Sequence, residues 1–332
     1  MATSLKGQDI LRVEQFTQDE IALIMETTAR FESALQAGKR LTNMIGKVLA
    51  TVFYEPSTRT RLSFESAMLR LGGQVISVAD AKSTSSAAKG ETLFDTGKMI
   101  ESYCDVAVIR HPVLGSAQAL AEGASVPVIN GGDGAGQHPT QALLDLYAIR
   151  KEKGRVEGLT IALAGDLKNG RTVHSLSTLL ANFGTRFYFV APRALAMPGE
   201  ITTRLQERGV EVVETTDLAQ AVASSDVLYM TRIQKERFAD LAEYERLKDS
   251  FIVDSALVQA AKPGLMIMHP LPRVDEIAKE VDIYPGAAYF RQAACGVPVR
   301  MALLALVTGQ EKFHGTRPKR AAQGTRRIKR AR

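Results

Sequence analysis

The chain has 332 residues and a mass of 36.1 kDa, which is enough for two domains, each with its own hydrophobic core. Hydrophobic residues make up 45% and charged residues 23%, values that exclude a mainly disordered, fibrous or disulfide-stapled protein. The net charge is +6, but nine Lys or Arg and no Asp or Glu lie in residues 312–332, so the rest of the chain is mildly acidic. A uniformly basic, nucleic-acid-binding body is therefore excluded, and only the tail could support such binding.

The first predicted element is an amphipathic helix. Thr17 and Glu20 form a capping box, apolar residues recur at helical spacing from Ile21 to Leu35, and Gly38 marks the end. Short β-rich runs separated by helical patterns follow at 48–54, 74–79, 105–109, 126–130, 159–164, 186–191, 210–213, 226–230, 251–253 and 265–268. Strands that alternate with helices predict parallel sheets, so we expect an α/β protein with doubly wound sheets.

Two helical segments are expected to connect the halves of the chain. The first, 139–153, begins with Pro139 and stops at Gly154; the second, about 292–307, follows the last strand and could return to the first domain. We therefore expect residues 1–139 plus 291–311 to form one domain and residues 140–290 the other. Residues 312–332 are expected to be a disordered basic tail.

Cysteine usage and the first residues indicate the compartment. Cys104 and Cys295 form no CxxC or zinc pattern, which favours two ordinary thiols in a reducing environment. The start of the chain lacks an apolar signal region, and no run approaches the length of an uncharged membrane span. We expect a cytoplasmic protein without a membrane segment.

Polar residues gather where the predicted strands end, which is the edge at which parallel α/β sheets bind ligands. The segments concerned are 55–61 (EPSTRTR), 110–112 (RHP), 131–141 (GGDGAGQHPTQ), 166–172 (DLKNGRT), 231–234 (TRIQ) and 269–273 (HPLPR). Ser57, Thr58, Arg59 and Thr60 open a predicted helix, whose free N–H groups favour a phosphate. The alternative for this loop is a simple helix cap with solvated arginines; Arg110 and His138, at other strand ends, favour a site.

Other known phosphate and metal motifs are missing. The sequence contains no GxxxxGK[ST], GxGxxG or HExxH, so we expect a small phosphorylated substrate and no metal or cofactor. Arg171, Arg232 and Lys89 suit a second substrate with two carboxylates. Three acidic residues, Glu55, Asp275 and Glu276, are expected to orient arginines. Two histidines, His111 and His174, are expected to be structural.

Eight motifs, in this order along the chain, resemble those of aspartate carbamoyltransferase catalytic chains. They are FYEPSTRTRLSFESAM (53–68), KGETLFDT (89–96), VIRHP (108–112), HPTQALLDL (138–146), GDLKNGRTVHSL (165–176), YMTRIQKER (229–237), HPLPRVDEI (269–277) and AYFRQAACG (288–296). The resemblance covers roughly residues 5–308 and not the basic tail. It implies the aspartate/ornithine carbamoyltransferase fold, with two doubly wound parallel-sheet domains joined by interdomain helices.

The resemblance also implies the site residues. Those for carbamoyl phosphate would be Ser57, Thr58, Arg59, Thr60, Arg110, His138, Gln141, Pro270 and Leu271, with Ser85 from a neighbouring subunit. Those for L-aspartate would be Arg171, Thr172, Arg232, Gln234, Leu271 and Pro272, with Lys89 from a neighbouring subunit. The catalytic groups among them would be Arg59, Thr60, Arg110, His138 and Gln141.

The implied activity is transfer of the carbamoyl group from carbamoyl phosphate to the amine of L-aspartate. The products would be N-carbamoyl-L-aspartate and phosphate, in de novo pyrimidine (UMP) biosynthesis, by a homotrimer with shared active sites. A regulatory chain or a dihydroorotase could associate with it. An enzyme for ornithine or a related amino acid is the alternative, but Pro270 stands where ornithine enzymes have a cysteine, and Arg232 suits a dicarboxylate.

Three further readings stay open from the residues alone. A Rossmann dehydrogenase would fit the βα pattern but lacks its glycine fingerprint. A nucleic-acid-binding protein would rest on the tail alone. An inactive scaffold is disfavoured because the polar residues of a working site are retained.

Overall fold

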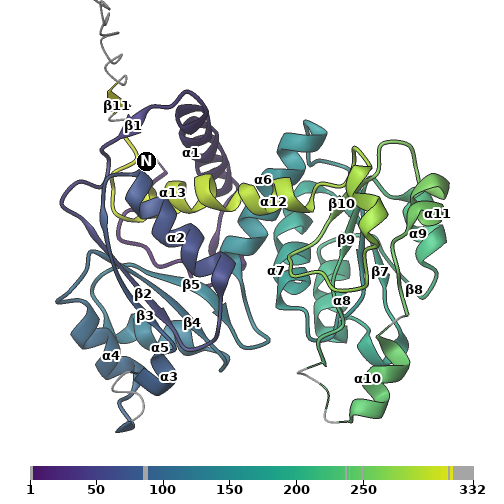
Figure 1. Ribbon diagram of the computed structural model, residues 1–332, viewed down its shortest axis with the longest axis horizontal. Coiled ribbons are helices and arrows are strands. Elements are labelled where there is room, and N and C mark those ends of the chain that lie inside the picture. Colours follow the sequence, from purple (N-terminus) through teal and green to yellow (C-terminus); the bar gives the residue numbers. More distant parts are fainter. Residues whose placement is uncertain are drawn as a thin grey trace, which may run out of the picture.

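The computed structural model describes residues 3–84, 89–235, 238, 240–248, 250–312 and 315–316. Two parallel sheets lie side by side, each covered by helices, and α6 (Pro139–Lys153), α12 (Tyr289–Ala294) and α13 (Gly296–Val307) run between them (Figure 1). The expectation of two doubly wound parallel-sheet domains is confirmed.

The first sheet has the strand order β3-β2-β4-β5. Its strands are β2 (Val48–Phe53), β3 (Gln74–Ala79), β4 (Val106–His111) and β5 (Val128–Asp133), all parallel. Alternate side chains of β2 enter two cores: Leu49 and Phe53 pack with one set of helices, and Ala50 and Val52 with the other. The first set is α1 (Gln18–Gln36), α2 (Thr58–Arg70) and α13; the second is α3 (Ala81–Thr84), α4 (Leu93–Ile100) and α5 (Ser116–Gly123).

The second sheet has the order β10-β9-β6-β7-β8, again parallel. Its strands are β6 (Thr160–Ala164), β7 (Arg186–Val190), β8 (Val212–Thr215), β9 (Val227–Met230) and β10 (Met266–Met268). Its helices are α7 (Arg171–Leu180), α8 (Gly199–Glu207), α9 (Leu218–Ser224), α10 (Leu241–Leu247) and α11 (Ser255–Ala260). Ile161 and Leu163 of β6 face the core shared with α6 and α7, whereas Ala162 and Ala164 face α9. This alternation is why the strand reads as a continuous apolar run.

The stretch Tyr289–Val307 is long and apolar enough to cross a membrane by length and composition, which the sequence analysis did not anticipate. However, 72% of its most apolar window is buried inside the protein, against α1, α2 and α6, and a buried core helix passes the same test. This stretch also forms two helices rather than the single one predicted over 292–307. The helix is interrupted at Cys295, which caps the end of α12 and the start of α13.

Two other expectations need correction. The run 251–253 is not a strand: Val253 makes only an isolated bridge, and its partner Ile277 lies outside both sheets. The predicted tail is not entirely unstructured, because β11 (Gly315–Thr316) pairs with β1 (Arg40–Leu41). The Asn43 side chain also donates to the carbonyl oxygens of Gln310 and Lys312. The rest of the predicted tail lies outside the described residues.

Candidate active site

A cavity of about 1030 Å³ lies between the two sheets. Residues that follow β2, β4 and β5 line one end, and residues that follow β6, β9 and β10 line the other. All six segments that the sequence analysis placed at strand ends contribute to it. The carboxyl ends of both parallel sheets therefore converge on one site.

The N-terminus of α2 supplies the hydroxyl-rich end of the cavity. Ser57 is the N-cap residue, yet its side chain makes no capping hydrogen bond, which rules out the reading of this loop as a simple cap. Ser57, Thr58, Arg59 and Thr60 all line the cavity, and burial lowers the pKa of the Arg59 guanidinium. Free backbone N–H groups, hydroxyls and a guanidinium together form a phosphate-sized anion site.

Glu55 holds two arginines from different sheets. Its Oε2 lies 3.3 Å from Arg110 Nε and 3.6 Å from Arg171 NH2. Arg110 also donates to the Gly131 carbonyl oxygen and Arg171 to that of Gly134. The expectation that Glu55 orients arginines is confirmed.

Gly132 makes room for this pair of arginines. Its φ is +116°, a conformation that L side chains rarely adopt. A Cβ atom there would come within 3.0 Å of Arg171 Cζ and 3.2 Å of Arg110 NH1. A glycine is therefore required where β5 passes beneath the two guanidinium groups.

His138, the N-cap residue of α6, and Gln141, in the first turn of α6, both line the cavity. The backbone N–H of His138 donates to Ser175 Oγ, whereas its buried ring Nδ1 has no hydrogen-bond partner among the described residues. Burial, together with Arg171, Arg110 and Arg300, holds the pKa of His138 well below its ordinary value. His138 thus lines the cavity as a neutral imidazole.

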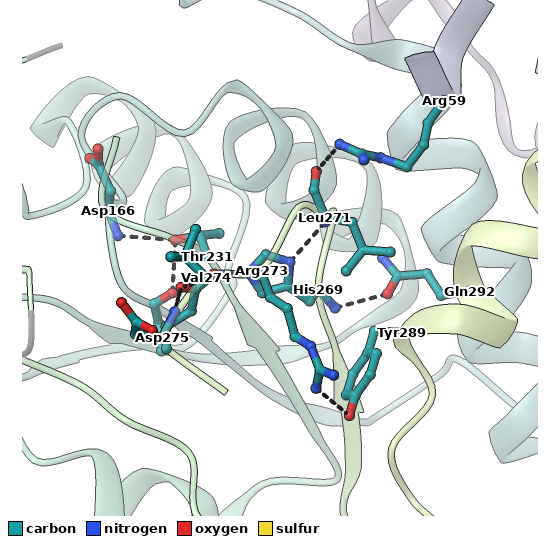
Figure 2. A network of polar contacts seen from close by, with 12 residues as sticks. Arg59, Asp166, Thr231, His269, Leu271, Arg273, Val274, Asp275, Tyr289 and Gln292 are labelled. Carbon is teal, nitrogen blue, oxygen red and sulfur yellow. Dashed lines mark hydrogen bonds and ion pairs between the residues drawn. The ribbon is translucent and has the colours of Figure 1, made fainter. Parts of the chain in front are cut away.

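The loop after β10 closes the cavity from the second sheet. His269 Nδ1 accepts from the Leu271 backbone N–H at 2.8 Å, so Nε2 carries the proton and donates to Glu276 Oε1 at 2.7 Å (Figure 2). Leu271 has a φ of +57°, which is uncommon for a side-chain-bearing residue and is typical of strained loops at functional sites. Its carbonyl oxygen accepts from Arg59 NH2 at 2.6 Å, which joins this loop to α2.

The remaining end of the cavity is cationic and lies on the second sheet. Arg171, Thr172, Arg232 and Gln234 line it, and Gln234 Nε2 donates to the Asn169 carbonyl oxygen. Two guanidinium groups and an amide suit a ligand with two carboxylates.

Most predicted site residues come together here. Those that line the cavity are Ser57, Thr58, Arg59, Thr60, Arg110, His138, Gln141, Arg171, Thr172, Arg232, Gln234, Pro270, Leu271 and Pro272. Lys89 is exposed and does not line the cavity of this single chain. Ser85 lies outside the described residues.

Arg300 and Gln292 also line the cavity but were not predicted as site residues from the sequence. Arg300 is 3% exposed and its guanidinium lies 4.9 Å from the centre of the Phe64 ring. The signal was present, because Arg300 is the one charge in the apolar run GVPVRMALLALV, and a lone buried charge demands a function.

One acidic residue was misassigned. Glu276 does not orient an arginine: its carboxylate accepts from His269 and from the backbone N–H groups of Val274 and Asp275. Nor does any described contact join Asp275 to an arginine; Arg273 is instead held by Asp282 and Tyr289. His174 is structural as expected, with Nε2 against the Leu167 carbonyl oxygen, and His111 bonds Ser116. Within the described part of the chain, no three His, Cys, Asp or Glu residues cluster to hold a metal ion.

Two family models match nearly the whole folded chain. The carbamoyl-phosphate-binding domain of aspartate/ornithine carbamoyltransferases matches residues 8–151, and the Asp/Orn-binding domain matches residues 157–307. The chain belongs to the aspartate/ornithine carbamoyltransferase family. The resemblance stated from the motifs is thereby confirmed.

Two relatives within this carbamoyltransferase family are similar over nearly their whole length, and a third is matched over a small part of its length. The aspartate carbamoyltransferase catalytic subunit of Thermococcus onnurineus is 55% identical over 304 residues, which is 92% of this chain and 98% of the relative. That of Leptospira biflexa is 52% identical over 302 residues, 91% of this chain and 97% of the relative. The multifunctional protein pyr1-3 of Dictyostelium discoideum is 49% identical over 92% of this chain, which matches 14% of that longer protein.

Solved structures of the carbamoyltransferase family share the fold. Aspartate transcarbamoylase from Trypanosoma cruzi, in complex with carbamoyl phosphate and aspartate, has a TM-score of 0.87 at 43% identity; 91% of this chain and 97% of that one are covered. The catalytic subunit of M. jannaschii aspartate transcarbamoylase has a TM-score of 0.85 at 48% identity, with 92% and 99% covered. The ligands named for the Trypanosoma cruzi structure are those of that relative.

Proposed function

We propose that this chain transfers the carbamoyl group of carbamoyl phosphate to the amine of L-aspartate, giving N-carbamoyl-L-aspartate and phosphate. The observation that carries the proposal is a single cavity with a phosphate-type end at the start of α2 and a dicarboxylate-type end at Arg171 and Arg232. The identity of 52–55% to aspartate carbamoyltransferase catalytic subunits supports it.

Carbamoyl phosphate is proposed to bind at the first end. Ser57, Thr58, Arg59, Thr60 and Arg110 would hold the phosphate through hydroxyl, backbone and guanidinium donors. The carbonyl oxygen would face Thr60, Arg110 and His138. The carbamoyl amide would donate to the side chain of Gln141 and to the backbone at Pro270 and Leu271.

L-Aspartate is proposed to bind at the second end. Arg171, Arg232 and Gln234 would hold its two carboxylates, with Thr172 nearby and the loop at Leu271 and Pro272 covering it. Arg171 is already oriented by Glu55, so little ordering is left for the moment of binding.

The reaction requires positioning and electrostatic stabilisation more than a protein base. The amine attacks the carbamoyl carbon, the C–O bond to phosphate breaks, and the departing phosphate accepts the amine proton. Negative charge that grows on the carbonyl oxygen would be stabilised by Thr60, Arg110 and the neutral His138. His138 is a poor base because its pKa is lowered, which supports a donor role for this ring.

The test compares aspartate with ornithine as acceptors for the purified chain. We expect carbamoyl-aspartate to form and carbamoyl-ornithine not to, because ornithine would bring a cation toward Arg232. Arg232→Ala should raise the KM for aspartate about 100-fold or more, as expected for a lost charge-assisted pair. The exposed Arg193→Ala in the same domain serves as the control. Carbamoylation of ornithine alone would overturn the proposal.

We also propose a homotrimer whose neighbouring subunits complete each site with Lys89 and Ser85. Lys89 is exposed and does not line the cavity of its own chain. Beside it in sequence, β3 forms one edge of its sheet, with Ile76 44% and Val78 37% exposed. An exposed apolar strand edge favours burial against another copy. The native mass of the purified protein tests this.

The remaining proposals concern context. We propose that residues 291–311 belong to the first domain, because α13 packs against α1 and α2. The protein would act in de novo pyrimidine biosynthesis in the cytoplasm, where its two free thiols, Cys104 and Cys295, stay reduced. Association with a regulatory chain or a dihydroorotase is supported by the catalytic-subunit names and by the multifunctional relative. Co-purification from native cells tests whether a regulatory chain or a dihydroorotase associates with the protein.

A further inference from the structure

A buried carboxylate joins the two walls of the cavity. Asp145, on α6, has no exposed surface and accepts three hydrogen bonds. Gln141 Nε2 donates to its Oδ1 at 2.9 Å and Gln292 Nε2 to the same oxygen at 2.6 Å, while Tyr229 OH donates to Oδ2 at 2.8 Å. The donors come from α6, α12 and β9, so one side chain connects a strand of the second sheet to two of the helices that run between the sheets.

At pH 8, where the Asp145 carboxylate is ionised, it can only accept hydrogen bonds, so it determines how each neighbouring amide is turned. Gln141 must present Nε2 to Asp145, which leaves Oε1 as the atom that it can offer to a donor in the cavity. Gln292 is turned in the same way, and its Oε1 accepts from the His269 backbone N–H at 2.9 Å (Figure 2).

The second branch reaches the other group that faces the carbamoyl amide. His269 accepts from the Leu271 N–H, which sets the Pro270–Leu271 backbone. Asp145 thus stands behind both acceptors of the proposed amide pocket, the Gln141 side chain and the loop backbone. The buried guanidinium of Arg300 stabilises the carboxylate electrostatically.

We propose that Asp145 is a positioning residue that makes the site selective for a carbamoyl amide, by fixing Gln141 with its Oε1 toward the NH2 group. This rests on the proposed function. Without the carboxylate, the side-chain amide of Gln141 could rotate by half a turn. Its Nε2 donor would then face the carbamoyl NH2 group, which is itself a donor. Selectivity between NH2 and a methyl group at the carbamoyl position would then be lost, while the phosphate end stays intact.

The experiment compares three ligands at pH 8: carbamoyl phosphate through its KM, and acetyl phosphate and inorganic phosphate as competitive inhibitors. Acetyl phosphate has a methyl group in place of the NH2. In Asp145→Asn we expect carbamoyl phosphate to bind about tenfold more weakly, the effect of one lost hydrogen bond to a buried acceptor. The inhibition constants of acetyl phosphate and inorganic phosphate should change less than twofold.

A double-mutant cycle with Gln141→Ala separates positioning from general damage. Gln141→Ala alone should also weaken carbamoyl phosphate about tenfold. If Asp145 acts through Gln141, adding Asp145→Asn to that background should cost less than about threefold more. Tyr229→Phe, which removes a different donor from the same carboxylate, should leave the ratio of acetyl to carbamoyl phosphate affinity within about twofold.

Each outcome is decisive. Equal weakening of all three ligands, or additive effects in the cycle, would overturn the inference while the unmodified chain still makes carbamoyl-aspartate. An unmodified chain without that activity would overturn the proposed function and this inference with it. If Asp145→Asn does not fold, the smaller Asp145→Ser replaces it, with the same expected loss of selectivity.

Discussion

The guanidinium of Arg59 donates a 2.6 Å hydrogen bond to the carbonyl oxygen of Leu271, although the two residues are 212 positions apart. Arg59 stands in the first turn of α2 on the first sheet, and Leu271 in the loop after β10 on the second (Figure 2). One side chain therefore contacts the proposed phosphate site and also holds the opposite wall of the cavity in place.

Arg59→Lys should lose this double role. A lysine carries the charge but lacks the planar fork that can reach two acceptors at once. We expect kcat/KM for carbamoyl phosphate to fall about 100-fold, as for two weakened charge-assisted bonds. Arg70→Lys, an exposed arginine on the same helix, is the matched control. Full activity in Arg59→Lys would show that the contact with Leu271 contributes nothing to catalysis.

In the Glu55→Gln variant, the two arginines that Glu55 orients should move apart. The neutral amide no longer offsets the repulsion between Arg110 and Arg171, which both lie within 3.6 Å of the carboxylate. We expect kcat/KM for aspartate to fall about 10- to 100-fold and the melting temperature to drop by a few degrees. Steady-state kinetics and calorimetry measure these. Glu211→Gln, which breaks only an exposed pair with Arg186, should change neither, and equal behaviour of the two variants would contradict the prediction.

Mixing two inactive chains should restore activity if sites are shared. Lys89→Ala and Arg59→Ala damage groups that we propose to come from different subunits of one site. Random reassembly of equal amounts should leave about a quarter of the sites intact, since each of two subunits must be the right one. The measurement is activity after dissociation and reassociation, with each variant alone as control. No recovery in oligomers proven to be mixed would argue against shared sites.

The free energy of unfolding should depend on pH through the titration of Asp145. Burial raises the pKa of Asp145 to about 7, against 3.8 as its ordinary value, although Tyr229, Gln141, Gln292 and Arg300 all favour the charged form. The folded state therefore holds a proton that the unfolded state releases, and this stabilisation is lost as the pH rises toward 7.

Denaturant unfolding of the unmodified chain and of Asp145→Asn at pH 5 and pH 8 measures the effect. At constant protomer concentration, the unmodified chain should lose stability relative to the variant between these values, by up to roughly 3 kcal/mol, about 1.4 kcal/mol for each pH unit from 5 to 7. The comparison cancels groups that the two chains share. A difference that does not change with pH would mean that Asp145 titrates normally.

The sequence predicted best where a local pattern and a tertiary role coincide. The capping box at Thr17 and Glu20 forms as expected, and α6 has the predicted bounds Pro139–Lys153, because proline and glycine mark its ends chemically. The polar segments after the strands could be placed in one site because parallel strands end at a common edge. Motif resemblance added which ligand each segment would bind.

What could not be predicted depends on contacts between distant segments. Nothing local in the chain places Gln292 against His269 and Asp145, because that meeting requires α12 to return across the cavity. The break at Cys295 and the pairing of Gly315–Thr316 with β1 are likewise set by packing and not by propensity. Glu276 was expected to orient an arginine because the sequence contains many arginines, whereas the fold places its carboxylate against His269.

The position of α13 at the end of the chain has a consequence for synthesis. Its residues Val299, Met301 and Leu303 complete the core beneath α1 and α2, yet they emerge from the ribosome only after the whole second sheet has been made. The amino-terminal half thus waits with an uncovered apolar groove, although amino-terminal domains ordinarily fold first. Chains truncated before residue 296 should therefore fail to fold the amino-terminal half, and slowed translation of the last helix should increase the time during which nascent chains need chaperone protection.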